Sequence, residues 1–335
     1  MDPQQELSQA PVTNIPTPEI KEALSAQSDS AHKFPVHFSL ALVIATGAVY
    51  GFLALQSPSV AISQTQPAAV VASVPNPFDT LALEAQSAFV RDRSEHKIVH
   101  AKNADAQLPL ASLTKVMLVL AVGDVLSPED FVTISGDAVG RGERGGPAEG
   151  EVWRVKDLID YTLVVSSNVG AEALAEAANE PLRARFAQAP EDGAAVWRMN
   201  MLAKELGLTK TYFLNPSGLD ISPTQPSAMG SARDATILLA YAFKTNPSEF
   251  AATSQSLLTV GPQDGPIVVV QNTNDAIAQI PSLLMGKTGF TDLAGGNLGI
   301  VFTGASNHTF VATVLGSSQM GRFSDILAVT ETAAR

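Results

Sequence analysis

Strand-like and helix-like patterns are unevenly distributed along this 335-residue chain, and that distribution restricts its fold more than any other feature. Two short apolar-bearing segments flank a polar turn in 87–103, which is typical of a β-hairpin. The apolar segments 295–305 and 308–316 predict antiparallel strands near the C-terminus, followed by a helix from about residue 322. The sequence therefore predicts an α/β (α+β) protein. Strands from both ends of the folded region form one antiparallel sheet, covered by helices and joined to a helical subdomain.

Between these strands, the spacing of apolar residues predicts helices. Segment 111–123 is almost wholly apolar and ends at a glycine, as helices often do. Segment 156–179 predicts two helices interrupted at Ser166-Ser167-Asn168, while 197–208 and 232–243 each predict one amphipathic helix. We therefore expect residues 78–335 to form one folded domain.

The first 77 residues differ in composition from this domain. Residues 1–37 are polar and proline-rich, which predicts a disordered tail. Residues 38–55 are apolar and uncharged, at the lower end of the length that spans a bilayer as a helix. Residues 56–77 are uncharged and rich in Ser, Gln, Pro and Ala, which predicts an extended linker.

The orientation of this expected span follows from the basic residues around it. Lys21 and Lys33 precede it, and the next basic residue is Arg91. The positive-inside rule then predicts a cytoplasmic tail, a single-pass anchor in the cell membrane and a domain outside the cytoplasm. A cleaved signal peptide ending near Ala61 is the alternative, although the preceding polar region is long for one. A buried core helix is the other alternative, and the tail-like flanks offer nothing to cover it.

Composition excludes several classes of protein. The chain has no cysteine, so disulfides, a cysteine nucleophile and thiolate metal sites are excluded. Its net charge of −12 argues against nucleic acid as a partner, because no basic stripe is present to neutralise phosphates.

The pattern Ser-x-x-Lys occurs three times. The copies are Ser30/Lys33, Ser94/Lys97 and Ser112/Lys115. Only Ser112 stands at the start of an apolar helix, where Lys115 lies one turn along on the same face. Burial among apolar neighbours favours the neutral amine, and a neutral lysine beside a serine is a competent general base. Taken alone, the pair also fits a capping serine followed by a surface lysine.

Two further motifs follow in the chain. Ser166-Ser167-Asn168 falls at the break between two expected helices, where it could also be a simple capping turn. Lys287-Thr288-Gly289 opens the C-terminal strand region, and its glycine would let a substrate backbone approach closely. Each motif is weak alone, but S-x-x-K, a Ser-x-Asn element and K-T-G in this order form a known set.

With these motifs, residues 78–335 resemble the low-molecular-weight penicillin-binding proteins, the D-alanyl-D-alanine carboxypeptidases of serine peptidase family S11. The matching blocks are LPLASLTKVM, LVVSSNVGAEALAE, TYFLNPSGLD, GSARDATILLA and MGKTGFTDLAGGNL. The resemblance implies a penicillin-binding protein/β-lactamase-like fold and a serine DD-peptidase domain. Many relatives also carry a second domain and a C-terminal amphipathic anchor, and we expect the N-terminal span to replace that anchor.

On the helical side, the resemblance implies four roles. Ser112 would be the nucleophile and Lys115 its base. Ser166 would relay a proton to the leaving amine, and Asn168 would hold the substrate amide.

On the strand side, the resemblance implies recognition of the substrate. Lys287 would support the proton network, Thr288 would contact the terminal carboxylate, and Gly289 would belong to the same substrate-binding segment. The backbone N–H groups of Ser112 and Phe290 would form the oxyanion hole. Arg322, at the start of the last helix, would bind the same carboxylate.

The chain also departs from the family. Val169-Gly170 replaces the usual Asp-Ala after the Ser-x-Asn motif, and Ser217 stands where a histidine is common. We expect local repacking at both places, because neither is a catalytic position.

The resemblance implies a D-Ala-D-Ala carboxypeptidase that acts on peptidoglycan stem peptides, with β-lactams as covalent inhibitors. A DD-endopeptidase that cuts crosslinks would use the same residues, since the width of the cleft separates the two activities. A β-lactamase would need a second base, for which the sequence offers no convincing acidic loop. A catalytically idle protein that binds wall or senses β-lactams remains the alternative of another class, although intact motifs argue against it.

No cofactor and no metal site are expected. His96 and His100 would share one face of a strand, but no third ligand accompanies them.

Overall fold

The computed structural model describes residues 76–142, 146–280 and 282–335. The expected tail 1–37, the expected span 38–55 and nearly all of the linker 56–77 lie outside these residues. Among the helices that the structure describes, none combines the length and apolar character needed to cross a membrane.

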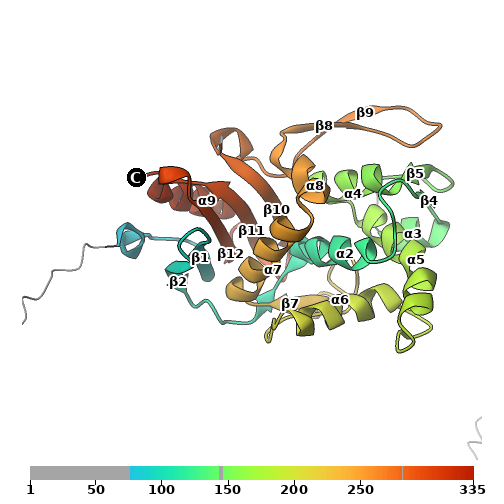
Figure 1. Ribbon diagram of the computed structural model, residues 1–335, viewed down its shortest axis with the longest axis horizontal. Coiled ribbons are helices and arrows are strands. Elements are labelled where there is room, and N and C mark those ends of the chain that lie inside the picture. The colour runs from blue at the N-terminus through green and yellow to red at the C-terminus, as the bar shows by residue number, and fades with distance from the viewer. Residues whose placement is uncertain (1–75, 143–145, 281) are drawn as a thin grey trace, which may run out of the picture. The chain divides into compact units, whose positions relative to one another are not determined.

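A five-stranded antiparallel sheet forms one half of the domain (Figure 1), in the order β10-β11-β12-β1-β2. Its strands are β1 (Ser87–Asp92), β2 (Lys97–Lys102), β10 (Leu283–Thr291), β11 (Gly295–Thr303) and β12 (Thr309–Ser317). The N-terminal hairpin pairs with β12, since Val90 lies opposite Ala312. The prediction of one sheet built from the two ends of the domain is confirmed.

Helices cover both faces of this sheet, because apolar side chains point alternately to the two faces along the strands. On β12, Val311 and Leu315 belong to the apolar cluster that includes α7 (Ala232–Thr245). Ala312 and Val314, between them, belong to the second cluster, which includes α9 (Gly321–Ala333). Successive side chains of a strand point to opposite faces, so each helix covers its own set.

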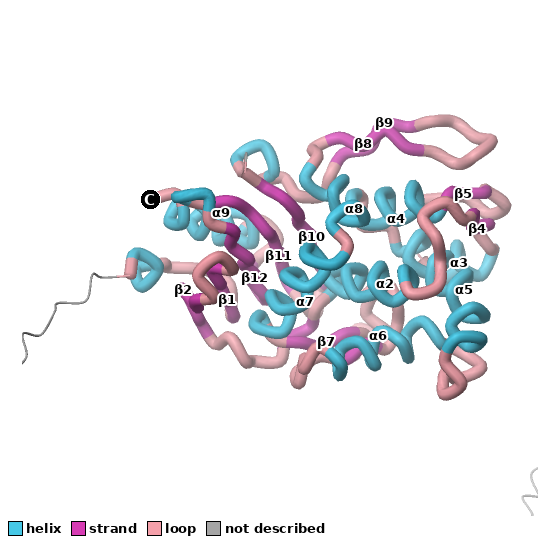
Figure 2. Tube along the Cα trace, in the orientation of Figure 1, coloured by secondary structure: helices cyan, strands magenta, loops and turns pink. Residues whose placement is uncertain are grey.

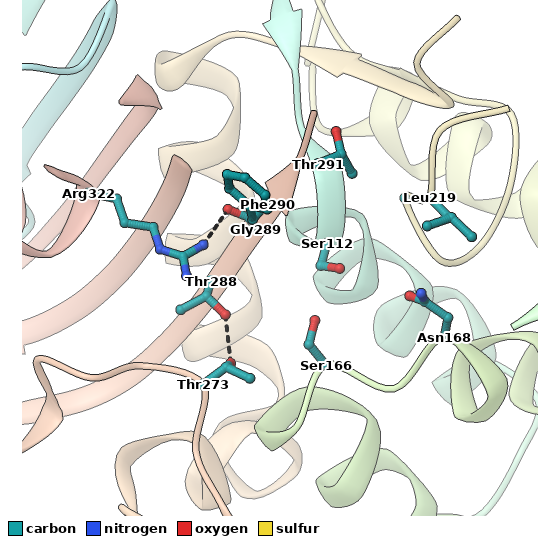
Figure 3. Close-up of a pocket in the computed structure, with 11 residues that line it drawn as sticks. Ser112, Ser166, Asn168, Leu219, Thr273, Thr288, Gly289, Phe290, Thr291 and Arg322 are labelled. Atoms are coloured by element: carbon teal, nitrogen blue, oxygen red, sulfur yellow. Dashed lines mark hydrogen bonds between the residues drawn. The ribbon is translucent and has the colours of Figure 1, made fainter. Parts of the chain in front are cut away.

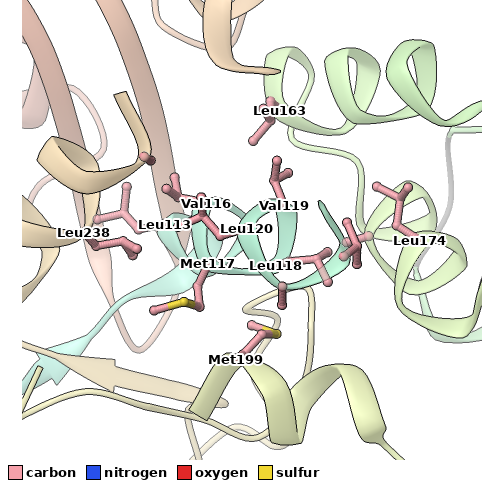
Figure 4. Packing of buried hydrophobic residues seen from close by; sticks show 14 of the residues in the cluster. Leu113, Val116, Met117, Leu118, Val119, Leu120, Leu163, Leu174, Met199 and Leu238 are labelled. Carbon is pink, nitrogen blue, oxygen red and sulfur yellow. The ribbon is translucent and has the colours of Figure 1, made fainter. Parts of the chain in front are cut away.

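The other half is helical (Figure 2) and surrounds α2 (Thr114–Gly123). All residues of α2 from Thr114 to Val122 are buried, as the unbroken apolar pattern predicted. In Figure 4, Met117, Val119 and their neighbours on α2 face Leu163, Leu174 and Met199. These residues come from α4 (Val155–Val164), α5 (Asn168–Arg185) and α6 (Ala194–Glu205).

Smaller elements complete the domain. They are β3 (Leu108–Pro109), β4 (Phe131–Thr133), α3 (Gly136–Arg141), β5 (Val152–Arg154), β6 (Tyr212–Phe213), β7 (Ala228–Gly230), α8 (Pro247–Phe250), β8 (Leu257–Val260) and β9 (Val268–Gln271).

One position in the sheet differs from the sequence analysis. Lys287-Thr288-Gly289 does not open the strand region but lies inside β10, an edge strand, with Thr288 opposite Leu298 of β11. The full length of this strand was not predicted, because the segment contains two glycines and few β-branched residues and its strand propensity is therefore weak. The consequence is that the motif lies on the sheet edge next to the helical half.

Candidate active site

Ser112 lies in a 3-10 turn, Ala111–Leu113, that leads directly into α2. Its neighbour Ala111 has a left-handed backbone with φ of 47°. Such a conformation is costly for a residue other than glycine and persists only where its surroundings enforce it. Gly218 packs directly against this turn, because a Cβ at Gly218 would lie 2.1 Å from the carbonyl oxygen of Ala111. The nucleophile candidate is therefore presented on a strained, closely packed turn.

Ser166-Ser167-Asn168 connects α4 to α5 through a second strained residue. Ser166 has φ of 63°, which turns the chain and leaves its hydroxyl beside the cleft. Ser167 caps α5, because its Oγ accepts a hydrogen bond from the N–H of Gly170 at 3.0 Å. The motif is thus a capping turn and also a way to direct Ser166 and Asn168 toward Ser112 (Figure 3).

Lys115 is completely buried, and three acceptors surround its amine. Nζ lies 2.8 Å from Ser112 Oγ, 2.7 Å from Asn168 Oδ1 and 2.6 Å from the carbonyl oxygen of Ser217. A neutral amine has two N–H groups, and the amide and carbonyl oxygens can only accept them. In that form, the nitrogen lone pair therefore faces the Ser112 hydroxyl.

Lys287 is the second buried lysine of the site. Its Nζ donates to Ser166 Oγ at 2.9 Å and to the carbonyl oxygen of Thr288 at 2.8 Å. Burial, followed by the positive charges of Lys115 and Arg322, holds the pKa of Lys287 well below its usual value. A lowered pKa lets this amine share a proton with the Ser166 hydroxyl.

Arg322 begins the α9 region and reaches the end of the cleft. Its Nη1 donates to the carbonyl oxygen of Gly289 at 2.7 Å, and its Nε has no hydrogen-bond partner among the described residues. Burial lowers the pKa of this guanidinium, and the charge of Asp275 offsets part of that effect. A buried cation with an unused donor is a suitable partner for an anionic ligand.

These side chains line one cavity of about 230 Å³ between the helical half and β10 (Figure 3). Its lining residues are Ser112, Ser166, Asn168, Gly218, Leu219, Thr273, Thr288, Gly289, Phe290, Thr291 and Arg322. Gly289 lets β10 lie against the turn of the nucleophile, because a Cβ there would be 3.0 Å from the carbonyl oxygen of Leu110. The structure thus brings every candidate residue of the sequence analysis to one cavity or to the lysines behind it.

Two contributors were missed by the sequence analysis. Thr273 lines the cavity, and its hydroxyl lies 2.7 Å from that of Thr288. The polar triplet Asn272-Thr273-Asn274, set shortly before the Lys-Thr-Gly motif, was the available signal. Ser217, interpreted as local repacking, in fact directs its carbonyl oxygen at Lys115.

The other departure from the family is a packing feature, as expected. A Cβ on Gly170 would lie 2.2 Å from Thr162 Oγ1, so the hydroxyl of Thr162 occupies the space that an alanine would need.

The histidines behave differently from the expected arrangement. His100 lies in β2, with Nδ1 3.1 Å from the carbonyl oxygen of Phe78, whereas His96 lies in the hairpin turn with φ of 57°. The two histidines do not share a strand face, because the turn between β1 and β2 is longer than the sequence indicated and includes His96.

The fold and the motifs gathered at this cavity are those that the resemblance implied for a serine DD-peptidase. A family model described as D-alanyl-D-alanine carboxypeptidase, peptidase S11, matches residues 70–319. The chain belongs to this family.

Relatives within the family have two activities. Over 217 residues, the chain is 33% identical to the D-alanyl-D-alanine carboxypeptidase DacF of Bacillus subtilis, covering 63% of this chain and 52% of DacF. It is 29% identical over 244 residues to the D-alanyl-D-alanine endopeptidase of Pseudomonas aeruginosa, covering 68% and 71%. The chain thus spans about half the length of DacF.

Solved structures carry the same fold. Penicillin-binding protein D2 from Listeria monocytogenes, in its ampicillin-bound form, superposes with a TM-score of 0.63 at 26% identity, covering 76% of this chain and 99% of that one. The D-alanyl-D-alanine carboxypeptidase of Mycobacterium tuberculosis has a TM-score of 0.66 at 24% identity, covering 78% and 94%.

Proposed function

We propose that this protein is a serine D-Ala-D-Ala carboxypeptidase that releases the terminal D-alanine of peptidoglycan stem peptides through an acyl-enzyme on Ser112. The observation that carries the proposal is the environment of Lys115. Two acceptors that cannot donate occupy its N–H groups, and the Ser112 hydroxyl lies 2.8 Å from the same nitrogen. This arrangement suits a neutral base poised to accept the Ser112 proton.

Acylation begins when Ser112 Oγ attacks the carbonyl carbon of the penultimate D-alanine. The Oγ–H proton passes to Lys115 Nζ, and the carbonyl π electrons move to the oxygen, which backbone N–H groups stabilise. The carbon–nitrogen bond then breaks. Its electrons go to the nitrogen of the departing D-alanine, which takes a proton from Lys115 through the Ser166 hydroxyl, held by Lys287.

Deacylation repeats these steps with water. Neutral Lys115 accepts a proton from the attacking water, the ester bond to Ser112 Oγ breaks, and the proton returns to Oγ. Thr288 and Arg322 bind the free carboxylate that distinguishes a chain end from an internal bond.

Product analysis tests this activity. The protein is incubated with a pentapeptide that ends in D-Ala-D-Ala and with a crosslinked peptide dimer, and the products are identified by mass spectrometry. We expect release of one D-alanine from the pentapeptide. Cleavage of the dimer with little release from the pentapeptide would instead establish the endopeptidase activity, which relatives of that name make the second candidate.

β-Lactams are proposed as covalent inhibitors of the same serine. The ampicillin-bound form of the Listeria relative supports this extension. A penicillin should therefore acylate the protein with one adduct per chain, as measured by intact mass.

We also propose that residues 38–55 anchor the protein in the cell membrane with its domain outside the cytoplasm. The uncharged apolar sequence and the two preceding lysines support this. Fractionation should recover full-length protein with the membrane, and external protease should release a fragment that begins within 56–77. Mature protein that begins near Ile62 would show a cleaved signal instead.

A further inference from the structure

A buried carboxylate lies behind the general base, outside the cavity. Glu172 stands on α5 one turn after Asn168, and only 7% of its surface is exposed. It is the one ionisable side chain among the buried residues of α5, a helix that the structure describes completely. Its buried neighbours on the helix are small or aliphatic, such as Val169, Ala173 and Ala175. A carboxylate in such a place needs a reason, because burying a charge is costly.

Three groups from three different parts of the fold act on this carboxylate. Arg141 of α3 places its Nε 3.3 Å from Glu172 Oε2. The Ser217 hydroxyl and the protonated form of Lys115 also act to lower the pKa of Glu172. Burial raises the pKa of Glu172, while Arg141, Ser217 and Lys115 oppose that rise. Burial is the largest of these effects, and the ion pair with Arg141 is the contact that favours the charged carboxylate.

Ser217 links the carboxylate to the base within one residue. Its hydroxyl acts on the pKa of Glu172, and its carbonyl oxygen accepts a hydrogen bond from Lys115 at 2.6 Å. Asn168, one helical turn from Glu172, accepts from the same amine at 2.7 Å. One of the two oxygens that accept from Lys115 is thus on the helix that carries Glu172, and the other belongs to Ser217, which acts on Glu172.

We propose that Glu172 is a positioning residue for proton transfer, whose carboxylate stabilises the ammonium that forms on Lys115 as Ser112 attacks. The inference rests on the proposed function, since it assumes that Lys115 takes the Ser112 proton. As the proton arrives, Lys115 becomes positive in a site where Lys287 and Arg322 are already clustered. The Glu172 carboxylate offsets this charge and makes the buried amine a stronger base.

Other charges near Glu172 pair among themselves. On α3, Asp137 approaches Arg141, and on α5 itself Glu176 bonds to Arg141 and to Ser135. The ion pairs on and beside the neighbouring helices α4 and α6 are Lys156–Asp160, Arg154–Asp157, Arg154–Glu129, Arg198–Asp124 and Arg198–Glu205. Glu172 differs from these carboxylates in lying buried on the helix whose first residue, Asn168, accepts from Lys115.

The test is the pH dependence of acylation by a fluorescent penicillin, measured on the full-length protein. For Glu172→Gln, the acid limb of the rate profile should move to lower pH by about one unit, because a nearby negative charge favours the protonated base. The plateau rate should fall several-fold, because a weaker base drives proton transfer less well. Glu172→Asp, which keeps the charge, should leave the limb near its wild-type position.

Glu176→Gln is the matched control, because Glu176 lies on the same helix and bonds to the same arginine. Its limb should coincide with that of the wild type. Glu172→Met provides a second neutral variant should the glutamine variant fold poorly, because its side chain is of similar length and Arg141 keeps its ion pair with Glu176. It should show the same displaced limb.

The outcomes separate the two proposals. An unmoved limb in both neutral variants, with a rate reduced equally at all pH values, would make Glu172 a purely structural residue and overturn the inference. An equal displacement in Glu176→Gln would overturn it too, by assigning the effect to Arg141. A wild-type protein that penicillin does not acylate would overturn the proposed function itself.

Discussion

The two walls of the cavity are electrostatically different. On the helical wall, Lys115 lies beside amide and carbonyl acceptors, with the Glu172 carboxylate behind it. On the strand wall, Lys287 lies among other cations, and burial lowers the pKa values of both Lys287 and Arg322. A carboxylate lies behind the lysine of the helical wall, whereas on the strand wall burial disfavours the charged forms of both cations and Asp275 offsets only part of that effect at Arg322.

This difference indicates a division of labour. A wall with a built-in carboxylate can accept and return protons without a change in its partners. A wall whose buried cations are incompletely compensated is suited to an anion from outside, and the free carboxylate of a peptide end is such an anion. We therefore expect substitutions on the helical wall to affect the chemical step, and substitutions on the strand wall to affect recognition of the chain end.

The largest effect is expected at the nucleophile. Ser112→Ala should abolish labelling by penicillin, because no other group in the cavity combines a helix start with a lysine base. Ser94→Ala, in the hairpin turn, should leave labelling unchanged, as measured by intact mass. Labelling that survives Ser112→Ala would refute the assignment of the helical wall to chemistry.

The second largest effect is expected at the base, Lys115. Lys115→Arg keeps the positive charge but cannot give up a proton, so acylation by penicillin should fall by about 10²–10⁴-fold. Circular dichroism should show an intact fold. Near-normal acylation of this variant would mean that the helical wall needs only a cation, and the comparison would fail.

On the strand wall, Arg322→Ala should cost about 2–3 kcal/mol in kcat/KM on a D-Ala-D-Ala peptide, the scale of a hydrogen bond to a charged group. The loss should be much smaller on the same peptide with an amidated C-terminus, which the wild type should already cleave poorly. Equal losses on the two peptides would assign Arg322 to the fold, where it holds the carbonyl of Gly289.

The smallest effect is expected at a packing position behind the helical wall. Gly170→Ala should lower the free energy of unfolding by about 1–3 kcal/mol, because its Cβ would meet Thr162 Oγ1. Adding Thr162→Ala should recover most of that loss in chemical denaturation. Failure of the second substitution to recover stability would show that Gly170 is required for backbone reasons.

Much of the fold followed from periodicity. The hairpin, the two strands β11 and β12 and the helices α2, α4, α5, α6, α7 and α9 are regular segments whose apolar spacing matches the faces they bury. The strands β8 and β9 were not expected, because their apolar side chains are largely exposed: Leu257 is 58% and Val269 is 65% exposed. Alternation between core and solvent, which reveals a strand, is absent there.

In the site, the sequence motifs predicted those residues whose role depends on the chemistry of their side chain. Contributions made through tertiary contact could not be predicted. The carbonyl of Ser217 acts regardless of its side chain, and Thr273 matters only because its loop approaches β10. Glu172 looked like part of an ordinary amphipathic helix, since sequence alone does not tell which glutamate a helix buries.

The crystal structure of the penicillin-treated protein tests the division between the walls most directly. We predict an ester between Ser112 Oγ and the opened lactam, with the drug carboxylate within hydrogen-bond distance of Thr288 and directed toward Arg322. Lys115 should remain between Asn168 and the Ser217 carbonyl. An adduct on another residue, or a carboxylate directed at the helical wall, would contradict the account.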